Sequence, residues 1–186
     1  YYAALNGLAE GTAQEEEAFK IELLMKQAHI TVEDRKVVDA ALKRAEETNG
    51  PAAAMELPNG QIITGKTSCL LGASSALLLN ALKNLAGLND ELHLISPSVI
   101  EPIQKLKTEY LGSINPRLHT DEILIALSIC AATDDNAKLA LEQIPKLSGC
   151  QAHTSVMLSS VDIKQFKRLN VQLTSEAKYE NKRIYH

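Results

Sequence analysis

The sequence has no excess of basic residues and no long hydrophobic run. Its 186 residues include 19 Lys and Arg against 23 Asp and Glu, which gives a formal net charge of −4. Because nucleic-acid binding depends on Lys and Arg that neutralise phosphates, this balance argues against a nucleic-acid partner. The most apolar stretch, around Leu77–Leu79, is interrupted by Asn80 and Lys83, whereas about 20 apolar residues are needed to cross a bilayer. We expect neither a nucleic acid nor a membrane as a partner.

Cysteine is scarce, and its spacing fits neither a disulfide framework nor a zinc motif. Cys69, Cys130 and Cys150 are an odd number and contain no CxxC pair. This usage is typical of a reducing compartment, and the chain begins at Tyr1 without a charged and apolar leader. We expect a cytoplasmic protein whose native start lies upstream of Tyr1.

The sequence also lacks the signature of a metal site or of a hydrolytic serine. Cys150 and His153, together with His93 and His119, are the residues that come nearest to a set of metal ligands. His153 alternates with apolar residues in a predicted strand, which favours a structural role. No GxSxG pattern surrounds any serine. We expect no metal and no cofactor.

Helical periodicity is clearest over residues 14–48. Apolar residues recur at helical spacing within 14–29, after three glutamates in the first turn, where the helix dipole favours negative charge. A capping sequence at Thr31 opens a second helix, which Asn49-Gly50-Pro51 ends. We expect residues 1–50 to form a small helical hairpin subdomain that is a satellite of the remaining chain.

From residue 51 the pattern changes to strands interleaved with helices. Pro58-Asn59-Gly60 between apolar runs predicts a β-hairpin, and the charge-poor stretch 68–85 predicts a buried core helix. The alternation predicts a three-layer α/β/α sheet domain over residues 51–186, whose basic end at 178–186 is expected to fray. The predicted strands are 52–57, 61–64, 92–95, 151–158 and 171–174, and the later helices are 98–111, 120–132, 135–147 and 162–169.

Several ordered blocks of the sequence resemble a known family. They are the stretches 58–68, 111–119 and 121–127, Ala152-His153 before a strand, and residues 21–25 of the first helix. Together they closely resemble the C-terminal part of uncharacterised protein family 0371, which is also filed as a domain of unknown function. Members of that family are considerably longer, so the resemblance implies that an N-terminal region of the same protein is a partner of this chain. It implies no established activity.

The order of elements is also similar to the α/β/α layout of the cytidine deaminases. Zinc deaminases need His/Cys-x-Glu on the first site helix and Pro-Cys-x-x-Cys at the second, because the metal takes three N or S ligands and a carboxylate moves protons. Residues 68–86 contain no acid, Arg117 follows Pro116, and Thr120 stands where the second cysteine would fall. The similarity is therefore one of layout, without zinc chemistry.

Residues 60–67 match the phosphate-loop pattern GxxxxGK[ST] and precede a predicted helix. A phosphate-binding loop must curl so that successive N–H groups face the phosphates. The sequence Gln-Ile-Ile-Thr at 61–64 instead favours an extended strand, and Gly60 is needed in the Asn-Gly turn. We therefore prefer the hairpin interpretation to the nucleotide-binding one.

Two loops present positive charge next to short polar side chains. Residues 65–68 and 115–119 each lead into a predicted helix, whose free N–H groups and dipole attract anions. In a three-layer α/β arrangement such loops gather at one edge of the sheet, where ligands bind. We expect them to form a pocket for a small anionic ligand, with His119 as the candidate for acid–base catalysis. The candidate site residues are Lys66, Thr67, Ser68, Asn115, Arg117 and His119.

The same residues also have ordinary structural interpretations. Thr67 or Ser68 would cap the following helix, which leaves its N–H groups satisfied without a ligand. Asp121 and Glu122 would complement the dipole of the next helix and pair with Arg117. In that case the second loop would be neutralised internally.

The sequence predicts no specific reaction. We favour a ligand-binding or accessory C-terminal domain of a larger cytosolic protein, whose site is completed by the N-terminal region. One alternative is a zinc-free enzyme on a deaminase-like layout that uses His119 and Lys66. Another is an oligomerisation module in which residues 14–48 pack against a second subunit.

Overall fold

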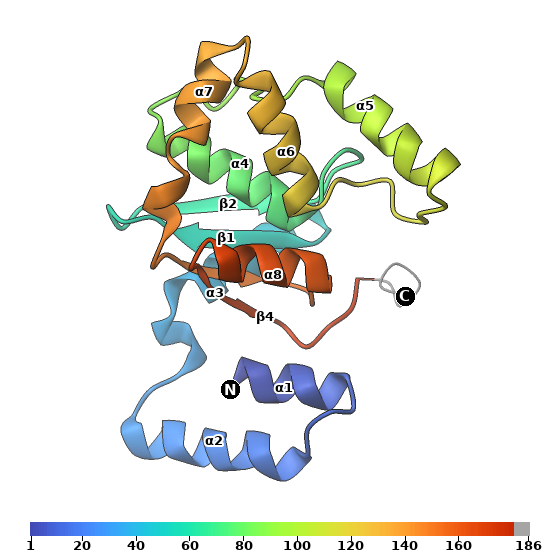
Figure 1. Cartoon of the computed structure of the whole chain (residues 1–186). Helices are drawn as coiled ribbons and strands as arrows, with labels where there is room; N and C mark the ends of the chain where they lie inside the picture. Colours follow the sequence, from blue (N-terminus) through green and yellow to red (C-terminus); the bar gives the residue numbers. More distant parts are fainter. Residues whose placement is uncertain (181–186) are drawn as a thin grey trace.

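A four-stranded mixed sheet forms the centre of the molecule (Figure 1). The computed structural model describes residues 1–180, so most of the basic end of the chain lies outside the described residues. The strand order is β2-β1-β3-β4; β1 runs antiparallel to β2 and β3, while β3 and β4 are parallel. The strands are β1 (Ala52–Glu56), β2 (Ile62–Lys66), β3 (Gln151–Thr154) and β4 (Gln172–Ser175).

Helices account for most of the remaining chain. Within residues 1–180 no helix combines the length and the apolarity that a bilayer crossing needs. Short non-α turns follow two of them, at Leu106–Tyr110 and Ile144–Leu147, and another lies at Val32–Asp34. The α-helices are α1 (Tyr2–Ala9), α2 (Glu15–Ala28), α3 (Lys36–Thr48), α4 (Ala73–Leu85), α5 (Pro97–Lys105), α6 (Thr120–Cys130), α7 (Asp135–Leu141) and α8 (Ser160–Arg168).

The two faces of the sheet are covered by different helices, which makes the predicted three-layer α/β/α arrangement. Ala53 and Met55 of β1 point into the main core with residues of α4 and α8. Ala54, between them, packs with Val37 and Ala41 of α3 on the opposite face. This alternation is the two-residue period of a strand buried on both sides. Helices α6 and α7 pack in turn against the outer side of α4 (Figure 1).

The predicted satellite at residues 14–48 is only partly separate. Helix α2 lies away from the sheet beside α1, whereas α3 covers β1, β2 and β3 (Figure 1). The apolar stripe of α3 is the reason, because Val37 and Ala41 are fully buried against the sheet. The expectation that both helices of the hairpin lie apart is therefore wrong for α3. A division of the chain at residue 50 stays a prediction.

The hairpin at residues 52–66 is confirmed, with Gly60 in its turn at a φ of 80°. The core helix begins later than predicted, at Ala73 rather than 68, because the hydroxyl of Ser68 accepts hydrogen bonds from the Leu70 and Leu71 amides and forms a turn. The predicted strand 92–95 is wrong. There the side chain of Lys83, a buried residue, contacts the Asp90 and Leu92 carbonyls, and no strand among residues 1–180 pairs with this segment.

Gly65 allows α4 to lie directly on β2. A Cβ atom at this position would come within 2.2 Å of the Leu77 nitrogen and 2.8 Å of the Ala73 carbonyl oxygen. These are backbone atoms, which cannot move aside without shifting the helix. The phosphate-loop pattern therefore contains a glycine whose role is close helix–strand packing.

We expect Gly65→Ala to lower the free energy of unfolding by about 1–3 kcal/mol or more, the range for overpacking a core. Gly50→Ala is the matched control, because its added Cβ would meet nothing closer than 3.9 Å. Urea unfolding of both variants measures the difference. Equal stability of the two would contradict the close packing of α4 on β2.

Candidate functional site

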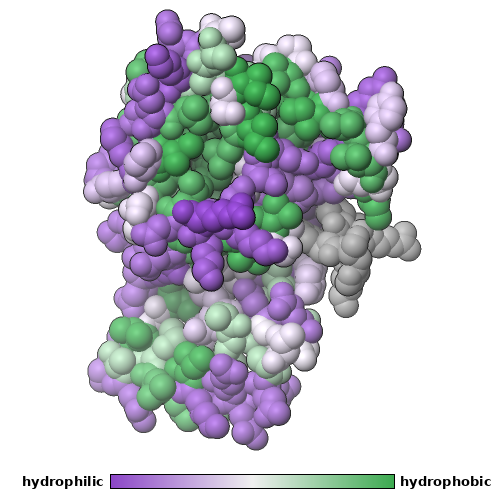
Figure 2. Space-filling view, in the orientation of Figure 1, coloured by the Kyte–Doolittle hydropathy of each residue, from purple (hydrophilic) through white to green (hydrophobic). Residues whose placement is uncertain are grey.

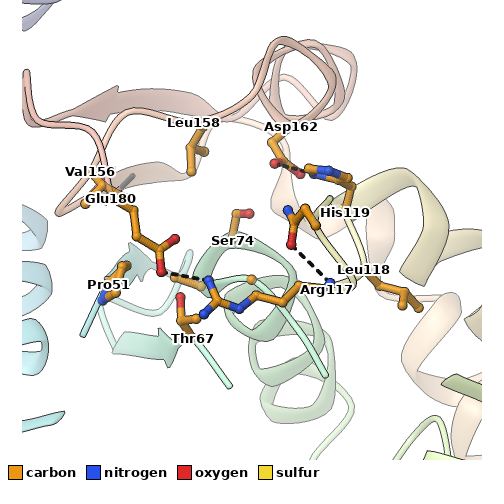
Figure 3. Close-up of a pocket in the computed structure, with 13 residues that line it drawn as sticks. Pro51, Thr67, Ser74, Arg117, Leu118, His119, Val156, Leu158, Asp162 and Glu180 are labelled. Carbon is orange, nitrogen blue, oxygen red and sulfur yellow. Dashed lines mark hydrogen bonds and ion pairs between the residues drawn. The ribbon is translucent and has the colours of Figure 1, made fainter. Parts of the chain in front are cut away.

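A small pocket with polar and apolar lining residues lies where α4, α6 and α8 begin (Figure 3). It encloses about 40 Å³. The two predicted loops meet here, because the Leu118 amide donates to the Leu70 carbonyl at 3.0 Å and joins the chain after β2 to the chain before α6. The polar residues that line it are Thr67, Ser74, Asn115, Arg117, His119, Asp162 and Glu180.

The start of α4 supplies uncapped hydrogen-bond donors to this pocket. Gly72 occupies the N-cap position and provides no side-chain cap. Within residues 1–180 the amides of Ala73, Ser74 and Ser75 make no hydrogen bond, although all three residues are buried. Unsatisfied first-turn N–H groups of a helix carry partial positive charge. The end of α4 is therefore ready to receive an acceptor.

Ser74 adds a hydroxyl to these amides. Its residue is 3% exposed, it lines the pocket, and its Oγ makes no hydrogen bond within the described chain. The neighbouring Ser75 differs, since its Oγ donates to the Leu118 carbonyl at 2.8 Å. Figure 3 shows Ser74 between Asp162 and Arg117. The Ser74 Oγ is not one of the buried atoms that lack a partner, so this hydroxyl is open to the pocket and available to a ligand.

Arg117 forms its ion pair with Glu180 (Figure 3). Nη1 lies 2.7 Å from Glu180 Oε1, and both side chains are partly exposed. The expected neutralisation by Asp121 or Glu122 does not occur: Glu122 instead pairs with Lys107 at 2.7 Å and accepts from the His119 amide. The guanidinium therefore holds a carboxylate that comes from the last described residue.

His119 and Asp162 form a dyad across the starts of α6 and α8. His119 Nδ1 lies 3.0 Å from Asp162 Oδ2, and Asp162 Oδ1 accepts from the Thr120 amide at 2.9 Å. The hydrogen bond with Asp162 raises the pKa of His119, against the opposing effect of burial. Burial alone would raise the pKa of Asp162, but hydrogen bonds from His119, Thr120 and Ser159 outweigh it and lower that pKa.

Three of the predicted site residues join His119 in this pocket, and two do not. Thr67, Asn115 and Arg117 line it, and the Asn115 side chain accepts from the Arg117 amide at 3.1 Å. Lys66 is exposed at the end of β2, outside the lining. Ser68 lies in the turn before α4 and borders a different cavity. The loop 65–68 is therefore not a helix N-terminus, and Gly72–Ser75 takes that place.

Sequence reasoning missed Ser74, Asp162 and Glu180 as parts of the site. The sequence did indicate Asp162, because Ser159 three residues before it predicts a helix N-terminus, and such helix ends line pockets of this kind. It did not indicate Ser74, since Ser74 sits inside an apolar run. Glu180 reaches the pocket through a segment that follows the last strand, which local patterns do not reveal.

His153 has an ordinary structural role on the opposite face of the sheet. Its ring nitrogens contact Thr174 Oγ1 at 2.8 Å and Glu176 Oε1 at 3.2 Å, and its ring packs on Tyr2. In the part of the chain that is described, no three His, Cys, Asp or Glu side chains are grouped so as to hold a metal ion.

The fold is an α/β/α domain with a pocket where three helices begin. The chain belongs to the family described as "Domain of unknown function DUF1846, C-terminal", whose model matches residues 33–185. This agrees with the resemblance drawn from the sequence blocks, and the family has no assigned function.

The similar proteins are longer bacterial chains called UPF0371 proteins. The chain is 52% identical over 185 residues to one from Corynebacterium efficiens and 44% identical over 185 residues to one from Streptococcus pyogenes. In both, the match covers 100% of this chain and 37% of the relative. A protein of Corynebacterium aurimucosum is 56% identical over 179 residues, which are 96% of this chain and 35% of that protein. This chain thus corresponds to the C-terminal part of a larger protein.

The His119–Asp162 pair should make stability depend on pH. Because the pKa of His119 is raised above its ordinary 6.5 in the fold, its contribution is full below the unfolded value and is lost as the pH rises through the folded one. The contribution of Asp162 is full above its ordinary 3.8 and is lost at lower pH. The pair is therefore strongest between these two values.

We expect wild type to be more stable than His119→Asn by about 1–2 kcal/mol near pH 5.5, and this difference to shrink as the pH rises through the raised pKa of His119. Thermal or urea unfolding across the pH range measures it. His93→Asn is the control, because His93 is exposed and makes no hydrogen bond within residues 1–180. A difference that grows with rising pH would have the wrong sign for this pair.

Proposed function

We propose that the pocket at the start of α4 binds a small anionic group, a phosphate or carboxylate, and that this C-terminal domain is a ligand-binding or accessory part of a larger cytosolic protein. The observation that carries the proposal is the buried, uncapped start of α4 beside Arg117. Free N–H groups, a positive helix end and a guanidinium all favour an anion, and Arg pairs with carboxylates and phosphates through parallel N–H donors.

Glu180 supports the choice of ligand class. Its carboxylate already sits on Arg117, which is the contact that a ligand's anionic group would make. The pocket of about 40 Å³ has room for only a few atoms beyond this carboxylate. A ligand would therefore bind by displacing Glu180, and its anionic group would then reach the α4 amides and the Ser74 hydroxyl.

We expect Arg117→Ala to weaken the binding of inorganic phosphate by about tenfold or more, the cost of one charged hydrogen bond. Glu180→Gln should strengthen it, because the competing charge is removed. Arg168→Ala is the control, since Arg168 lies on the exposed C-terminal end of α8. Calorimetric titration of the four proteins compares them, and equal affinities in all four would contradict an anion site at Arg117.

Alanine variants of two adjacent serines should distinguish an effect on ligand binding from an effect on stability. Ser74→Ala should weaken phosphate binding several-fold while leaving stability unchanged or slightly raised, because its hydroxyl has no partner within residues 1–180 and Ala favours a helix. Ser75→Ala should instead lower stability by about 1–3 kcal/mol, because it leaves the buried Leu118 carbonyl without its donor. Loss of stability in Ser74→Ala, with affinity unchanged, would show that Ser74 is structural.

A second candidate function is acid–base chemistry on the bound ligand. It is favoured by the His119–Asp162 dyad, since Asp162 holds Nδ1 while Nε2 makes no hydrogen bond within the described residues. A carboxylate that fixes one ring nitrogen is a common way to orient a histidine for proton transfer. Lys66, which the sequence analysis combined with His119, is outside the pocket lining. Turnover that is lost in His119→Gln, with phosphate binding retained, would support this candidate.

A further inference from the structure

Helix α2 is weakly packed against the rest of the domain. It packs against α1 and makes no other substantial contact with a helix or strand among residues 1–180. Of its 14 residues only Ala18 is buried. A helix of this length is marginal in water without tertiary packing. Its position at the far end of the molecule from α4–α7 is visible in Figure 1.

The outward side of α2 carries large apolar side chains. Phe19 is 60% exposed and Leu23, one turn later, is 42% exposed. Ile30 lies just beyond the helix, after His29 in the left-handed conformation, and is 51% exposed. Figure 2 shows apolar surface interspersed with polar surface at this end of the molecule. Single exposed apolar residues are ordinary, but three on a poorly packed helix and the residues just after it indicate a contact surface.

Charged pairs border this apolar line. Glu16 and Lys20 are 3.9 Å apart, and Glu22 and Lys26 are 3.1 Å apart. An apolar strip with a polar border is typical of interfaces between domains of one chain, which are more polar than obligate subunit interfaces. The surface therefore fits a neighbouring domain better than it fits an obligate partner subunit.

The family comparison identifies that neighbour. The matched C-terminal model begins at residue 33, so α1 and α2 precede it. The longer relatives nevertheless align with the whole of this chain, which covers 37% of their length. The segment with α1 and α2 thus lies between the C-terminal domain and the large N-terminal region of the same protein.

We propose that the N-terminal region of the full-length protein packs against the outward side of α2, at Phe19, Leu23 and Ile30. This contact completes the packing of α2, which lacks it within residues 1–180. It is independent of the anion pocket, because α2 contributes no residue to the pocket lining.

The test is cysteine accessibility in the full-length protein. Phe19→Cys should react with a maleimide at least tenfold more slowly than Lys164→Cys, which places a thiol on the exposed side of α8. Labelling is followed by mass spectrometry of the peptide that contains each position, so the exposed native Cys69 does not interfere. Ile30→Cys provides a second position if Phe19→Cys fails to fold, and it should be protected in the same way.

Equal labelling rates at the α2 and α8 positions would overturn the proposal. Protection that disappears when the protein is diluted to a monomer would assign the surface to a second copy, and would also overturn it. Protection that is independent of concentration supports the N-terminal region as the occupant.

Discussion

The close approach of α4 to β2 is the constraint on which the rest of the site depends. It requires a residue without a side chain at position 65, because the helix backbone occupies the space of a Cβ. The helix is held further by Asn80, whose side chain donates to the Thr64 carbonyl at 2.9 Å, and by Ser75. With α4 fixed in this way, its N-terminus faces the loop that carries Arg117. The pocket is therefore a consequence of helix–strand packing rather than of a dedicated binding loop.

The charges around the pocket are arranged in two separate groups. Both carboxylate oxygens of Asp162 form hydrogen bonds at the starts of α6 and α8, with the Thr120 amide, His119 and the Ser159 hydroxyl. The α4 side has no such internal acid, and Arg117 relies on Glu180 for its counter-charge. A buried positive helix end without a fixed acid favours an external anion. The difference between the two groups explains why the α4 side is the better candidate for ligand binding.

The sequence was informative where a local pattern determines the structure. The Asn-Gly turn, the α3 stripe and the interleaved strands predicted the hairpin, the helices and the α/β/α class. Prediction failed at 92–95, where the Lys83 ammonium contacts the carbonyl of Leu92 and that of Asp90 just before it. It failed again at Ser68, where a serine turn ends before the helix begins. Both failures concern side chains that form hydrogen bonds with the backbone. The spacing of apolar residues does not reveal such hydrogen bonds.

The segment after β4 brings Glu180 to the pocket by extending the sheet contacts. The Glu176 amide donates to the Thr154 carbonyl at 3.0 Å, and the Met157 amide donates to the Lys178 carbonyl at 2.8 Å. A carboxylate held on so short an anchored segment has a high effective concentration at Arg117. A free carboxylate that made only this one contact would therefore displace it poorly. A ligand that succeeds must make contacts that Glu180 does not make, and the unpartnered Ser74 hydroxyl and α4 amides supply them. This favours an anionic group with several acceptor oxygens, such as a phosphate, over a simple carboxylate.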